Sequence, residues 1–317
     1  MIRFILIALF PLLCHGQFSF SEVDQLFQEK KYAEAETLLK LHLHQNPDDT
    51  KAVELLGDSF GYRSLWDEAI YRYKKLTKSD HKNANYHYKY GGALGMKALK
   101  LNKFRALGLL GDIKSSFLKA AELDPDHIET RWALVELYMQ LPGIVGGSKK
   151  KSLKYAEELQ KLSAVDGYLA KGYIYEYDDK PELAEKNYVK AIEVGGSLTC
   201  YSKLTGLYEK ENQPDKAIQN LENTKAVHPR NALHYQIGKV CADYNLELEK
   251  GVYCLQKYIQ DYSVEDGVPL EWAYYRLAQI FTHKNEKQEA LKWIDKALET
   301  QPNFKVAQKE RVRILSL

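Results

Sequence analysis

The feature that most constrains this chain is a recurring pair of positions, in which a small residue is followed four residues later by a large one. Most of its occurrences fit that description and the rest keep its register: Ala35/Leu39, Ala69/Tyr73, Ile113/Phe117, Ser152/Ala156, Ala184/Tyr188, Ala217/Leu221, Gly251/Leu255 and Ala290/Ile294. The successive spacings are 34, 44, 39, 32, 33, 34 and 39 residues, so the underlying period is about 34. Such a period predicts an array of repeated supersecondary units.

A second motif precedes the first in each unit. It reads Leu56-Gly57-x-x-Phe60, Tyr90-Gly91-x-x-Leu94, Leu134-Val135-x-x-Tyr138, Lys171-Gly172-x-x-Tyr175, Leu204-Thr205-x-x-Tyr208, Ile237-Gly238-x-x-Cys241 and Leu277-Ala278-x-x-Phe281. The periodic segments contain no alternating β-branched runs and no internal proline, so they predict helices. Breaks with a proline follow residues 45, 123, 227 and 300, and each closes one helix before the next begins.

Together the two motifs resemble the tetratricopeptide repeat, whose signature is W-x2-L-G-x2-Y, then A-x3-F, then P. Residues 168–195 match it best, followed by the units ending at Pro229 and Pro302. The resemblance implies an all-α fold: a right-handed α-α superhelical solenoid of about eight helix hairpins. We expect it to cover residues 17–317, with an atypical first unit at 21–47 and a capping helix at 304–317. Small residues on both helices of a hairpin should let those helices approach closely.

Two insertions depart from the period. Residues 97–111 keep an amphipathic helical texture, which predicts a longer helix pair. Residues 141–152 contain three glycines followed by Ser148 and three lysines. This segment invites a phosphate-binding hypothesis, but its spacing does not match a phosphate-binding loop and no strand precedes it. We favour a tight connection in which Ser148 caps the next helix.

The N-terminus predicts export. Residues 4–13 form an unbroken apolar run behind one arginine, which is too short to span a bilayer and is typical of a signal peptide over residues 1–16, cleaved before Gln17. A buried N-terminal helix and a lipid anchor at Cys14 are the weaker interpretations. Three cysteines then remain, Cys200, Cys241 and Cys254. We expect buried free thiols, with a bridge between Cys241 and Cys254 as the lesser alternative.

Charge and motifs exclude several function classes. Lys and Arg total 45 against 43 for Asp and Glu, and no basic block points to nucleic acid. No catalytic elbow, metal-binding histidine pair or dinucleotide turn is present, so we expect no enzyme, no cofactor and no metal. Tyrosine is frequent, at 23 residues, which suits rings that are half buried with the hydroxyl in water.

The concave face of such a solenoid, lined by the first helices, is where partners usually bind. Outward positions near each small residue predict an aromatic groove with an acidic bias. The candidate partner-binding residues are Asp58, Tyr88, Trp132, Glu136, Tyr173, Glu176, Tyr177, Tyr235, Lys239, Trp272 and Tyr275. About half of the rings should instead belong to the core between repeats.

The groove predicts a protein or extended peptide as the partner, bound by a scaffold in a bacterial cell envelope, the periplasm or outside the cell. Some relatives in this family hold a terminal carboxylate with paired Asn and Lys or Arg. The corresponding positions here, which include Gly92, Gly206 and Gln279, lack that clamp, and the acidic residues favour basic segments. The second hypothesis is a solute- or glycan-binding accessory protein that uses the same groove.

Overall fold

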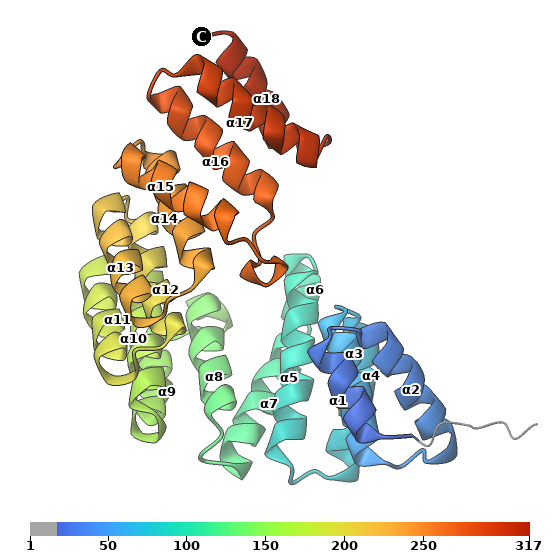
Figure 1. The fold of residues 1–317 in the computed structure, drawn as a ribbon. Coiled ribbons are helices and arrows are strands. Elements are labelled where there is room, and N and C mark those ends of the chain that lie inside the picture. Colours follow the sequence, from blue (N-terminus) through green and yellow to red (C-terminus); the bar gives the residue numbers. More distant parts are fainter. Residues whose placement is uncertain (1–17) are drawn as a thin grey trace, which may run out of the picture. The chain divides into compact units, whose positions relative to one another are not determined.

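The computed structural model describes residues 18–317, which form helices and connecting turns and no strand (Figure 1). The all-α fold predicted from the repeat is therefore confirmed. The predicted signal peptide lies outside the described residues. The chain divides into an N-terminal unit, up to Leu137, and a C-terminal unit, from Tyr138 onward. The boundary falls inside helix α8, Ile128–Gln140.

The helices follow the predicted pairs. The N-terminal unit contains α1 (Phe20–Gln28), α2 (Tyr32–Gln45), α3 (Thr50–Tyr62), α4 (Trp66–Ser79), α5 (Ala84–Leu99), α6 (Lys103–Leu107) and α7 (Leu110–Leu123). The C-terminal unit contains α9 (Lys149–Leu162), α10 (Ala164–Tyr177), α11 (Pro181–Gly195), α12 (Leu198–Lys210), α13 (Pro214–Val227), α14 (Asn231–Tyr244), α15 (Leu248–Gln260), α16 (Leu270–His283), α17 (Lys287–Thr300) and α18 (Lys305–Leu315). Two short 3-10 turns, η1 (Gly143–Val145) and η2 (Val264–Asp266), lie in its connections.

The two sequence motifs meet inside each hairpin. A Cβ added at Gly57 would lie 2.6 Å from the Tyr73 ring, and one at Gly172 would lie 2.3 Å from the Tyr188 ring. The same addition at Gly238 would come within 2.4 Å of the Leu255 side chain. The small residue of the first helix therefore sits directly against the large residue of the second, because no larger side chain fits between them.

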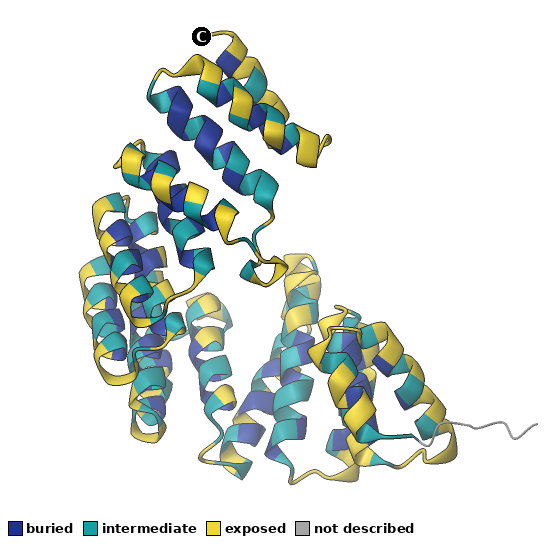
Figure 2. Ribbon diagram, in the orientation of Figure 1, coloured by how far each residue is buried: buried dark blue, intermediate teal, exposed yellow. Residues whose placement is uncertain are grey.

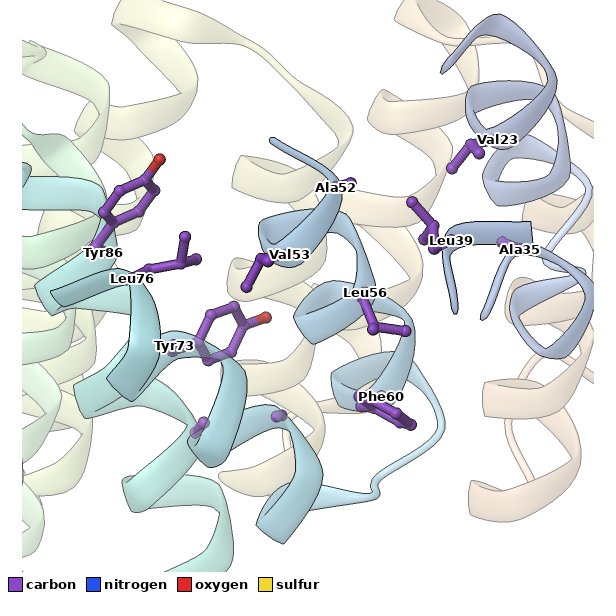
Figure 3. Packing of buried hydrophobic residues seen from close by; sticks show 12 residues of the cluster. Val23, Ala35, Leu39, Ala52, Val53, Leu56, Phe60, Tyr73, Leu76 and Tyr86 are labelled. Carbon is purple, nitrogen blue, oxygen red and sulfur yellow. The ribbon is translucent and has the colours of Figure 1, made fainter. Parts of the chain in front are cut away.

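The buried residues of each unit lie where its helices face one another (Figure 2). Figure 3 shows the core of the first two hairpins, in which Leu56 and Phe60 of α3 lie between Leu39 of α2 and Tyr73 of α4. All of these side chains are at most 6% exposed. Because one hairpin cannot bury both of its faces, adjacent hairpins complete each other's cores.

Within a hairpin the chain reverses through a residue in the left-handed conformation. Ser64, Asp179, Asn212 and Asn285 have φ between 54° and 61° and stand two residues before the second helix. The N–H of the residue that follows each of them returns to a carbonyl of the last helical turn, as from Leu65 to Phe60 O at 2.9 Å. This is the Schellman arrangement, which satisfies the free carbonyls of the first helix.

The two insertions take different forms. Residues 97–111 do lengthen α5, to 16 residues, but the rest is a separate short helix, α6, so the expected longer helix pair forms only in part. The break comes at Asn102, whose side chain accepts a hydrogen bond from Arg105 N at 3.1 Å and starts the new helix. In residues 141–152, Ser148 caps α9 by accepting from Lys151 N at 3.3 Å, as predicted.

The last helix, α18, agrees with the predicted capping helix. It buries Ala307 and Ile314, with Phe304 just before it only 6% exposed. The helix packs against α17 and exposes its other side, which carries charged residues. Within residues 18–317, no helix combines the length and apolar character that crossing a membrane requires.

Candidate functional site

The acidic candidate Asp58 of the N-terminal unit is already engaged by other residues of the protein. Asp58 on α3 accepts hydrogen bonds from the Tyr73 hydroxyl at 2.7 Å and from Lys89 Nζ on α5 at 2.7 Å. Lys89 also pairs with Glu54 at 2.6 Å. Burial opposes the charge of Lys89, but Asp58 and Glu54 outweigh it and raise the pKa of the ammonium group. The cluster links three helices and leaves little of the negative charge of Asp58 for a partner.

Tyr88 lies on α5 and is half buried. Its ring centre lies 5.2 Å from that of His127 and 6.1 Å from that of Phe117. Burial raises the pKa of its phenol, and the charges of Glu129 and Glu136 raise it further. Glu136 on α8 is exposed and Trp132 of the same helix is partly exposed. These positions are accessible from solvent on the first helices, as the repeat predicts.

In the C-terminal unit, ion pairs join each first helix to the next. Lys210 of α12 lies 3.5 Å from Glu176 of α10, and Lys239 of α14 lies 2.7 Å from Glu209 of α12. Arg276 of α16 pairs with Asp243 of α14. The first helices α10, α12, α14 and α16 therefore present one connected surface, whose acidic groups are largely neutralised by basic groups of the following repeat.

Sequence reasoning selected Lys239 as a candidate but did not predict any of these ion pairs, although a signal was present. The hydrogen bonds of Lys89, Lys239 and Arg276 to their carboxylates span 31, 30 and 33 residues, close to one repeat. Opposite charges one period apart on equivalent helices could have predicted the pairs. The expected acidic bias of the groove is reduced accordingly.

The aromatic candidates divide into exposed and buried rings. Tyr177 is 53% exposed and lies 6.1 Å from the partly exposed ring of Tyr173, both on α10. Tyr235 and Tyr275 are only 5% and 8% exposed, and burial raises the pKa of both phenols. Trp272 packs edge-on against Phe304 with ring centres 4.7 Å apart. The rings that belong to the core are therefore Tyr235 and Tyr275, two of the seven candidate rings and fewer than the expected half.

We define the first-helix face as the solvent-accessible positions of these helices in the C-terminal unit. They are Tyr173, Tyr177, Ser202, Gly206, Lys239 and Trp272. Gly206 has no atom within 4 Å of the place where a Cβ would be, so the surface is open there. Because Glu176, Lys239 and Arg276 are tied in ion pairs, the face is fixed in shape while its exposed rings are available for contact.

The glycine-rich insertion lies beside this face. A pocket of about 300 Å³ is lined by Gly143, Gly147, Ser148, Lys149 and Tyr177, among others. Lys149 is paired with Asp178, so its charge is balanced locally. A larger cleft of about 650 Å³ lies among α11, α12 and α13 and contains none of the candidate residues.

The remaining groups of chemical interest are the cysteines and the possible metal ligands. Cys200, Cys241 and Cys254 are buried free thiols, as expected, and form no bridge. Burial raises the pKa of the Cys241 thiol to about 12, so it stays protonated and unreactive near neutral pH. Among residues 18–317, no group of three or more His, Cys, Asp or Glu side chains is placed to hold a metal ion.

The comparison with protein families identifies two repeats in the chain. The tetratricopeptide repeat model matches residues 165–194 and 273–304, which correspond to the hairpins α10–α11 and α16–α17. The chain carries tetratricopeptide repeats at these two hairpins. The first match covers almost the same residues as the best unit in the sequence, and the two motifs continue in register through most of the other hairpins.

The chain also resembles solved structures that are described as tetratricopeptide repeat proteins. One from Parabacteroides merdae is 13% identical, with a TM-score of 0.49, and the match covers 93% of this chain and 97% of that one. A thermophilic protein from Thermus thermophilus is 16% identical, with a TM-score of 0.41 and coverage of 75% and 96%. YrrB, reported to have an unusual peptide-binding site, is 18% identical, with a TM-score of 0.43 and coverage of 61% and 96%. No curated protein has a matching sequence.

Proposed function

We propose that this protein is a non-catalytic scaffold that binds a polypeptide along its first helices, in a bacterial cell envelope or outside the cell. The observation that carries the proposal is the first-helix face of the C-terminal unit, where Tyr177 is 53% exposed beside the partly exposed Tyr173 on a surface fixed by ion pairs. Exposed tyrosines on a rigid surface give a large contact area at a small entropic cost.

The ion pairs of the acidic residues limit which chemistry the partner can have. Because Asp58, Glu176 and Glu209 are paired with lysines, a strongly basic peptide would gain little from them. A segment that offers apolar or aromatic side chains to Tyr173 and Tyr177 fits this face better. The candidates Asp58, Tyr88, Trp132 and Glu136 of the N-terminal unit extend the proposal to its first helices. The proposal that the protein is exported rests on the apolar run of residues 4–13.

Affinity capture tests the proposal. Tyr173→Ala/Tyr177→Ala removes the accessible rings, and we expect the protein to lose most of its captured partner while it keeps its helical content. Tyr253→Ala is the matched control, because this tyrosine is 62% exposed on α15, a second helix of the same unit. Tyr235 is unsuitable for the test, since truncating a ring that is 5% exposed would also cost stability. Equal capture of the partner by the unmodified protein, by Tyr173→Ala/Tyr177→Ala and by Tyr253→Ala would refute binding at the first-helix face.

A further inference from the structure

The insertion at residues 95–111 exposes an apolar and basic surface that the repeat fold does not use. Met96, Leu99, Phe104 and Leu107 are 43%, 72%, 87% and 46% exposed. Lys97, Lys100, Lys103 and Arg105 lie among them, and no acidic residue occurs in the segment. Figure 2 shows α6 and the adjoining end of α5 largely as exposed. We name these eight side chains the α6 patch.

The patch protrudes and is not part of a packed interface within its unit. Helix α6 has no buried residue of its own, although it contacts both α5 and α7. Phe104 and Leu107 are three residues apart and so share one side of this short helix. Asn102 fixes the start of the helix through its bond to Arg105 N at 3.1 Å. The apolar side chains are therefore held outward by a defined local structure.

The basic residues of the patch differ in the interactions that they make with other residues of the protein. Lys97 pairs with Asp67, and Lys100 lies 5.8 Å from the centre of the Trp66 ring. Lys103 and Arg105 are exposed on either side of Phe104. Exposed cations beside exposed apolar side chains match a surface that is anionic outside and apolar just beneath.

We propose that the α6 patch binds the surface of a membrane that contains anionic phospholipids. Phe104, Leu99 and Leu107 enter the boundary between headgroups and acyl chains, while Lys103 and Arg105 contact the phosphate groups. A convex patch on a five-residue helix suits insertion into such a boundary better than it suits enclosing a protein side chain. The attachment is peripheral and reversible, since the patch is far smaller than a membrane-spanning segment.

Vesicle sedimentation tests the proposal. The protein is prepared from Gln17 onward, which retains every described helix and removes the apolar run of residues 4–13. We expect it to sediment with phosphatidylglycerol vesicles, to bind phosphatidylcholine vesicles much more weakly, and to lose binding as salt is added. Each basic residue at the surface contributes about fivefold, so Lys103→Ala/Arg105→Ala should weaken binding by more than about tenfold. Phe104→Ala should weaken it by about tenfold.

Matched controls distinguish binding through the α6 patch from nonspecific binding. Val264 is 83% exposed but is followed by Glu265 and Asp266, so Val264→Ala should not change binding. Lys305→Ala/Lys309→Ala removes the same charge from the exposed side of α18 and should have little effect. Circular dichroism confirms that every variant is folded. Equal binding to both lipids, or equal losses in the patch and control variants, would overturn the proposal, as would no binding at all.

Discussion

Three tyrosines of this protein are buried residues whose hydroxyls donate to carboxylates. Tyr73 donates to Asp58 at 2.7 Å, Tyr188 to Glu176 at 2.8 Å and Tyr208 to Glu185 at 2.9 Å. In each case burial raises the pKa of the phenol, and the neighbouring carboxylate raises it further. These hydroxyls therefore bind helices together, whereas the sequence suggested that they would lie in water.

Replacing Tyr188 with phenylalanine should reveal this bond through its pH dependence. Near neutral pH, Tyr188→Phe should lower the free energy of unfolding by about 1 kcal/mol, because the hydrogen bond is lost. In the unfolded chain the phenol ionises near its ordinary pKa of 10.0, whereas the folded protein keeps it protonated. Stability from this group is thus complete below pH 10 and is lost as pH rises further.

Above pH 10 the difference in free energy of unfolding between the unmodified protein and Tyr188→Phe should shrink by about 1.4 kcal/mol per pH unit. Urea denaturation at several pH values measures it, with Tyr253→Phe, an exposed ring, as the control that should track the unmodified protein throughout. A gap between the two proteins that stays constant or widens above pH 10 would show that the Tyr188 phenol is not protected by folding.

At the scale of single positions, sequence reasoning placed the candidate residues on first helices, but it did not find their partners. It selected Asp58 and Glu176 for the groove, where both lie on first helices as predicted. Each carboxylate pairs with a lysine about one repeat later and accepts a hydrogen bond from a tyrosine hydroxyl of the second helix. Three helices must therefore be placed before these partners can be identified. For the same reason, the sequence did not show that Tyr235 would be one of the buried rings.

At the scale of the helix, contact between the two motifs determines how closely each hairpin packs. Gly172 faces Tyr188, Gly57 faces Tyr73 and Gly91 faces Phe117, with no room for a methyl group between them. Gly206, also within a first helix, faces open space. The two kinds of glycine should therefore respond in opposite ways to the same substitution.

Gly172→Ala should destabilise the protein by about 1–3 kcal/mol, because its Cβ would lie 2.3 Å from the Tyr188 ring and would force the helices apart. Gly206→Ala should instead leave stability unchanged or raise it by up to about 1 kcal/mol, since alanine favours the helix and meets no atom. Thermal and urea denaturation measure both. Equal effects of the two substitutions would mean that close packing at Gly172 does not set the hairpin.

Helix positions were well predicted from the sequence because period and proline breaks both mark them. The exceptions are informative: the extension after α5 breaks at Asn102, where a capping side chain outweighs the amphipathic pattern. The left-handed turn residues also escaped prediction, since Ser64 and Asp179 are not the glycines that such turns usually select.

At the scale of the whole molecule, each unit is built by neighbours in sequence. In the C-terminal unit α10 packs on α9, α11 and α12, and α16 packs on α14, α15, α17 and α18. Local contacts of this kind are what make repeat proteins tolerant of insertions, because an inserted segment disturbs only adjacent helices. Residues 97–111 and 141–152 are accordingly free to acquire surfaces of their own.

The most direct test of the account is photo-crosslinking from two matched tyrosine positions. A photoreactive phenylalanine derivative replaces Tyr177 on the first-helix face or Tyr253 on a second helix, and both sites are more than half exposed. Mass spectrometry of the products then identifies what each position touches. A polypeptide adduct is expected at Tyr177 that Tyr253 does not form. Equal adducts from both positions, or none from Tyr177 with its partner bound, would rule out binding at the first-helix face.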